Sequence, residues 1–181
     1  MAPRASLALS VLSALTVGAG ALALPPALEV QDRSLTGSLP KGVAVSPDGA
    51  TLFVTHFGNA NGRSVGVYDV AALRRTTTID LPGVAVESVV SPDGARLYVS
   101  DFLGDAIHVV RLSDRRRIRT ISAGHQPKVL ALSADGARLF AANWGGATVS
   151  EIDPAAGRVV ATHRVRSEEH TSELQSPCNL V

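Results

Sequence analysis

Apolar and polar residues alternate with a period of two along most of the chain between Leu39 and Val165. The stretch Val65-Gly66-Val67-Tyr68-Asp69-Val70 is one example. Short alternating runs bounded by turn residues are typical of β-strands with one buried face, so the pattern predicts an all-β fold. The expected strands lie at about residues 42–46, 51–55, 64–70, 75–80, 86–91, 96–100, 105–111, 116–121, 128–133, 138–142, 147–152 and 158–163.

A four-residue turn repeats along the same stretch. Ser46-Pro47-Asp48-Gly49 recurs as Ser91-Pro92-Asp93-Gly94 and as Ser133-Ala134-Asp135-Gly136, at intervals of 45 residues (46 to 91) and 42 residues (91 to 133). Proline fixes φ at the first central position, the aspartate bonds nearby backbone N–H groups, and glycine takes the left-handed position that returns the chain. Each turn therefore joins two strands, and the spacing predicts three repeats at about residues 39–81, 82–123 and 124–165.

The S-P-D-G turn and the strand after it, Leu97-Tyr98-Val99-Ser100-Asp101, resemble the YVTN-type β-propeller repeat found in lactonase-like and surface-layer-type proteins. The resemblance covers residues 39–165 and implies four-stranded blades in a ring of about seven, of which three are present. It implies that the remaining blades belong beyond Val165. It leaves the function open, because the family includes binding scaffolds, lactonase-like enzymes and cofactor-dependent oxidoreductase subunits.

Both ends of the chain differ from the repeats. Arg4, an uncharged run over residues 7–24 and the small residues of Ala21-Leu22-Ala23 predict a signal peptide at residues 1–23 and a secreted or periplasmic protein. The mature chain would start at Leu24 or Leu22 and continue through a linker at residues 24–38. The alternative is an uncleaved membrane anchor, since the run nearly reaches the ~20 residues that a spanning helix needs.

Residues 166–181 read RSEEHTSELQSPCNLV and match no repeat. Their first part resembles the translation of a sequencing-library adapter, so we expect a non-native tail and native sequence that stops near Val165. The single cysteine, Cys178, lies in this tail. Without it the chain has no disulfide and no thiol nucleophile.

The net charge of +1 indicates neither a nucleic acid nor an anionic membrane as partner. In an antiparallel unit, the loops after the second strands share one rim with the linkers between units. We expect a ligand or a protein partner to bind at this rim, around the mouth of the central channel of the propeller. Lysines would bind an anionic group, and aromatic rings would form the walls of the site. The candidate residues are His56, Phe57, Asp101, Phe102, Asn143, Trp144, His125, Lys41 and Lys128.

Two alternatives stay open for this rim. The polar residues can cap turns and the aromatic residues can wedge between blades, since repetition in every unit favours an architectural role. An enzyme of the same architecture is the second alternative. The sequence indicates no catalytic residue, metal ligand or cofactor. We also expect apolar faces on the two outer units, around Val65 and Val67 in the first and Val149 and Ile152 in the third, to lack a neighbour.

Overall fold

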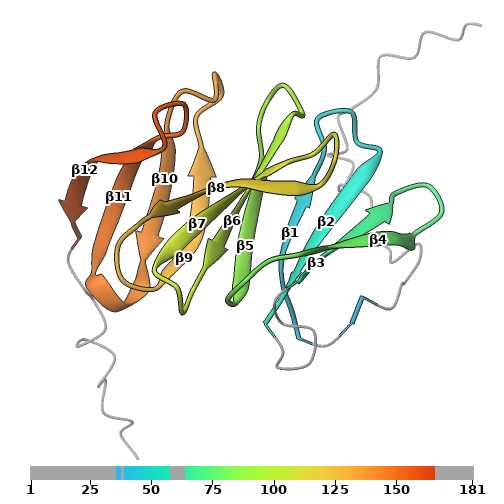
Figure 1. Cartoon of the computed structure of the whole chain (residues 1–181), viewed down its shortest axis with the longest axis horizontal. Coiled ribbons are helices and arrows are strands. Elements are labelled where there is room, and N and C mark those ends of the chain that lie inside the picture. Colours follow the sequence, from blue (N-terminus) through green and yellow to red (C-terminus); the bar gives the residue numbers. More distant parts are fainter. Residues whose placement is uncertain (1–35, 38, 58–63, 166–181) are drawn as a thin grey trace, which may run out of the picture. The chain divides into compact units, whose positions relative to one another are not determined.

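The computed structural model describes residues 36–37, 39–57 and 64–165 (Figure 1). The predicted signal peptide, most of the predicted linker and the predicted tail lie outside the described residues. Within the described residues the strands are β1 (Pro40–Val45), β2 (Thr51–His56), β3 (Ser64–Asp69), β4 (Arg74–Asp80), β5 (Ala85–Val90), β6 (Arg96–Asp101), β7 (Ala106–Arg111), β8 (Arg116–Ser122), β9 (Pro127–Leu132), β10 (Leu139–Asn143), β11 (Thr148–Asp153) and β12 (Arg158–Arg164).

These strands form three four-stranded sheets, in which each strand pairs antiparallel with the next along the chain. We call β1–β4 blade 1, β5–β8 blade 2 and β9–β12 blade 3 (Figure 1). The predicted all-β fold with three four-stranded units is confirmed. The first strand of each blade begins earlier than predicted, because a register shift such as the one between Pro40 and Val43 bulges the strand and extends the pairing.

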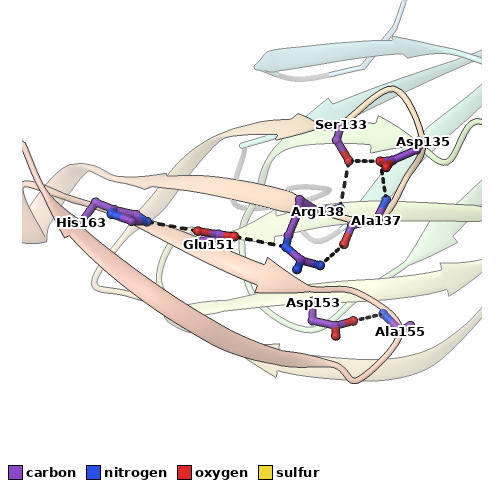
Figure 2. A network of polar contacts seen from close by, with 8 residues as sticks. All are labelled: Ser133, Asp135, Ala137, Arg138, Glu151, Asp153, Ala155 and His163. Atoms are coloured by element: carbon purple, nitrogen blue, oxygen red, sulfur yellow. Dashed lines mark hydrogen bonds and ion pairs between the residues drawn. The ribbon is translucent and has the colours of Figure 1, made fainter.

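The repeated turns have the hydrogen bonds that their sequence predicts. In blade 3, Asp135 accepts from the hydroxyl of Ser133 at 2.6 Å and from the N–H of Ala137 at 2.9 Å (Figure 2). Gly136 takes a φ of +71° and donates its N–H to the carbonyl of Ser133. The same bonds recur at Ser46 and Asp48 in blade 1 and at Ser91 and Asp93 in blade 2. The turn chemistry is therefore local, and it fixes where each hairpin reverses.

Two apolar clusters pack the blades against each other, and blade 2 contributes to both. In β6, Leu97 and Val99 belong to the cluster shared with blade 1, whereas Tyr98 belongs to the cluster shared with blade 3. This alternation follows from the pleat, which points successive side chains to opposite faces of a strand. Blade 2 is thus buried on both faces, as an interior blade of a propeller is.

The outer faces differ from the expectation. Val65 and Val67 pack against blade 2, and so does Ile152 of blade 3, because each is buried in a cluster between two blades. Val149 and Ile152 cannot share a face, since they are an odd number of residues apart in one strand. Figure 2 shows that the face bearing Glu151 instead carries a chain of charged side chains, with Arg138 at 3.1 Å and His163 at 3.2 Å from its carboxylate.

The open apolar positions of blade 1 lie on its first strand. Val43 is 60 % exposed and Val45 is 51 % exposed. At the place of Val43, blade 2 has Ser88 at 2 % and blade 3 has Leu130 at 6 %, and both lie against the preceding blade. Within the described residues, no strand covers this part of blade 1.

Candidate functional site

Three aromatic residues form a row across the blades at the predicted rim. Phe57, Phe102 and Trp144 each follow the last residue of a blade's second strand. Their backbone N–H groups donate to the linker carbonyls of Leu39, Val84 and Gln126 at 2.9, 3.0 and 2.9 Å. These equivalent bonds place the rings side by side, with centroids 6.0 Å apart for each neighbouring pair. We call these three residues the aromatic row.

A lysine lies at each end of this row. The Nζ atom of Lys41 is 5.6 Å from the centroid of Phe57, and that of Lys128 is 5.4 Å from the centroid of Trp144. A cation over an aromatic face is attracted by the ring quadrupole. Both lysines lie in the bulged starts of first strands, and in blade 1 the bulge is held by the N–H of Gly42, which donates to Thr55 Oγ1 at 2.8 Å.

The row and the lysines surround a hollow of about 120 Å³. We call it the rim hollow. Its lining is two sets of equivalent positions, one from the first strands and one from the loops after the second strands: Lys41, Val86, Lys128, Phe57, Phe102 and Trp144. The structure therefore brings together five of the nine candidate residues and adds Val86, which the sequence analysis did not single out.

Three other candidate residues lie buried in the sheets. His56, Asp101 and Asn143 end their second strands, and each faces the preceding linker. His56 Nε2 lies 2.8 Å from the carbonyl of Thr36, and Asp101 accepts from the N–H of Val84 at 2.8 Å. These contacts position the linkers.

Asn143 makes its contacts within its own blade instead. It donates to Thr148 Oγ1 at 3.0 Å and to Ser150 Oγ at 2.9 Å. A Cβ on Gly124 of the preceding linker would collide with the Asn143 amide, so the linker passes directly over it.

Asp101 is also paired with a buried histidine of β7. His108 Nε2 lies 3.3 Å from Asp101 Oδ2 and 2.9 Å from the carbonyl of Pro82, and both side chains are buried. Burial raises the pKa of Asp101, but the hydrogen bonds from His108, Val84 and Gly104 outweigh it and leave that pKa below its ordinary value. The blade-1 equivalent of His108 is Gly66, so the repeat alone gave no signal for this pair.

His125, the ninth candidate, is exposed at the rim. Its Nδ1 lies 3.1 Å from both carboxylate oxygens of Asp105, and the N–H of Gln126 donates to the same carboxylate at 2.8 Å. The Gln126 N–H, followed by the bond with His125, holds the pKa of Asp105 below its ordinary value. The carboxylate of Asp105 therefore contacts the linker between blades 2 and 3, through His125 and Gln126.

A larger hollow of about 600 Å³ lies at the opposite rim, between blades 1 and 2. Asp48 and Asp93, which line it, already accept the hydroxyl and backbone bonds of their own turns. These bonds, led by the serine hydroxyls, hold the pKa of both carboxyls below its ordinary value. These two carboxylates are therefore occupied by turn formation. Asp69 and Arg115 also line this hollow. The rim hollow is the better candidate site because it brings together five of the candidate residues.

In the described part of the chain, no cluster of three or more histidine, cysteine, aspartate or glutamate side chains could hold a metal ion. No helix in the same residues has the length and apolar character needed to cross a bilayer.

Comparison with known proteins agrees on the fold. No family model matches the chain. It is 31 % identical over 140 residues to the seven-bladed beta-propeller protein Rv1057 of Mycobacterium tuberculosis, covering 75 % of this chain and 34 % of the relative. It is 30 % identical over 117 residues to Antigen Lp49 of Leptospira interrogans, covering 62 % of this chain and 25 % of the relative. The chain thus spans a quarter to a third of the length of these relatives.

Two solved structures are similar to the described blades. Hydrazine synthase of Kuenenia stuttgartiensis matches with a TM-score of 0.64 at 28 % identity, over 74 % of this chain and 38 % of that one. A functionally unknown protein from Desulfotomaculum acetoxidans matches with a TM-score of 0.65 at 17 % identity, over 74 % of this chain and 45 % of that one. Together with the three stacked four-stranded sheets, these similarities show that residues 39–165 fold as blades of a β-propeller.

Proposed function

We propose that the chain is part of an extracytoplasmic β-propeller of the YVTN-repeat type that binds a ligand or a protein partner at the rim hollow. The observation that carries the proposal is the aromatic row with a lysine over each end. Trp144 is exposed and Phe57 and Phe102 are partly exposed. Aromatic rings and cations held in one place by backbone geometry are typical of recognition surfaces. His56 and Asp101, buried beneath the row, support the same role, because they bond to the linkers that accept the backbone N–H groups of the row.

The site can be tested with the full chain on an array of short synthetic peptides. Binding should be lost when Phe57 and Phe102 are both replaced by alanine. It should persist in a matched variant at the opposite hollow, Asp69→Asn with Arg115→Gln. Circular dichroism melts of both variants check that the fold is retained. Binding that survives the first variant and disappears in the second would place the site at the opposite rim and contradict the proposal.

The location rests on the leader-like residues before Leu24. Expressed with its own leader in a bacterium, the protein should appear outside the cytoplasm with an N-terminus at Leu22 or Leu24. Intact Met1 in the membrane fraction would favour the anchor instead. Enzymatic activity is the alternative, and steady hydrolysis of a lactone panel by the full chain, absent from a heat-denatured sample, would favour it.

A further inference from the structure

Resting on the proposed function, we infer that the partner at the rim hollow is an acidic stretch of polypeptide with an apolar side chain between its carboxylates. The first reason is charge. Lys41 and Lys128 are the only lysines in the sequence, and they occupy equivalent positions at the two ends of the aromatic row. Among the described residues, neither ammonium group takes part in an ion pair.

Within the described residues, the neighbouring carboxylates form no ion pair with these lysines and instead bond to other groups. Asp105 is bonded to His125 and to the N–H of Gln126. Glu87, which follows Val86 on β5, accepts from the N–H of Ser88 at 3.0 Å. The rim hollow therefore has a cation at each end and an apolar middle, and complementary charge on a partner would select both register and orientation.

The second reason is apolar surface beside those cations. Trp144 is 57 % exposed, and Leu39 and Leu103 of the same rim are also exposed. These side chains come from all three blades, so the apolar surface extends along the rim beyond the hollow. Aromatic anchors next to an exposed apolar surface are typical of sites for protein partners.

The third reason is size. Sites for small molecules usually enclose roughly 300–1,000 Å³ and bury most of the ligand. The rim hollow measures about 120 Å³, which suits one side chain and leaves the rest of a ligand outside. An extended segment can place one apolar side chain in the hollow and carboxylates over both lysines, whereas a free small acid reaches one lysine at a time.

The sequence supplies its own reporter for this binding, because Trp144 is the only tryptophan and lies in the site. Its fluorescence is followed in the full chain during titration with the end-blocked peptide Glu-Phe-Glu-Phe-Glu. Two other probes are the peptide Gln-Phe-Gln-Phe-Gln and free phenylacetate. The acidic peptide should give a saturable change, with an affinity about tenfold higher than either of the others.

Replacing both lysines by glutamine should lower the affinity for the acidic peptide to that for the glutamine peptide. Replacing both lysines by arginine should preserve the difference in affinity between the two peptides. Equal affinity for the two peptides would overturn the acidic partner. Phenylacetate binding as tightly as the acidic peptide would overturn the polypeptide partner. Either result leaves the proposed function intact, because that fails only if array binding is insensitive to the loss of Phe57 and Phe102.

Discussion

Among the described residues nothing covers the first strand of blade 1, so we expect the chain to associate with itself. Between the blades, the positions equivalent to Val43 and Val45 are covered by the preceding blade, but in blade 1 these valines are 60 % and 51 % exposed. A surface shaped to receive another blade is available to a second copy of the chain. We therefore expect association that grows with concentration and depends on these two side chains.

The perturbation is Val43→Thr with Val45→Thr. Threonine keeps the β-branched shape and the strand preference, so the blade itself should tolerate it. In an associated state each hydroxyl is buried without a partner, at about 1 kcal/mol each. The two hydroxyls together weaken association by about 2 kcal/mol, which makes the dissociation constant roughly 30-fold larger.

Sedimentation velocity over a range of concentrations measures this constant. The matched control is Ile118→Thr, which changes a 45 % exposed side chain on β8, an outer strand of the central blade. The control should associate like the unmodified chain. A monodisperse monomer for the unmodified chain, or equal weakening by the control, would refute the argument that blade 1 presents an open inter-blade surface.

The linker glycine Gly83 should be harder to replace than the turn glycine Gly49. Gly49→Ala places its Cβ in open space and should cost about 1 kcal/mol of stability because of the positive φ. Gly83→Ala has the same backbone cost, and its Cβ also collides with Asp101, so it should lower the melting temperature further. The pKa values of the turn carboxyls of Asp48, Asp93 and Asp135 lie below the ordinary 3.8, mainly because each carboxyl accepts a serine hydroxyl. These carboxylates therefore stabilise the fold above about pH 4, and the effect is lost as pH falls through the folded pKa. A variant with asparagine at all three turns should therefore melt with less dependence on acid, and an unchanged acid profile would contradict this. Genomic resequencing across codon 165 should show a further propeller repeat in place of residues 166–181, and recovery of the same tail would contradict its adapter origin.

Much of the fold could be predicted because the turn chemistry is contained in five consecutive residues. The Ser46 and Asp48 bonds repeat at Ser133 and Asp135 without help from distant segments. What could not be predicted depends on contacts with other strands. The bulge at Gly42 is held by Thr55 of β2, whose hydroxyl also donates to the carbonyl of Val86 in blade 2 at 2.6 Å. The short 3₁₀ turn at Trp144–Gly146 is another feature that the sequence analysis did not predict.

For the site, strand parity placed the candidates at one rim but did not separate those that line the hollow from those beneath it. What separates them is the end of the strand. β2 is buried on both faces from Phe53 to His56, whereas Phe57 lies beyond the strand end and is partly exposed. The pairing of Asp101 with His108 could not be predicted from the repeat, because the position of His108 is occupied by Gly66 in blade 1.

The repeat also separates architectural roles from recognition. His56, Asp101 and Asn143 differ in chemistry, yet all three pack against a linker glycine, which is the behaviour of a position that the fold requires. The first-strand position at the hollow departs from this, since blades 1 and 3 supply lysine and blade 2 supplies Val86. A fold that needed only packing there would gain little from two charged side chains, because an ammonium over a ring adds only about 0.5–1 kcal/mol at an exposed site. The departure from the repeat, more than the repeat itself, supports the proposal that the rim hollow binds a partner.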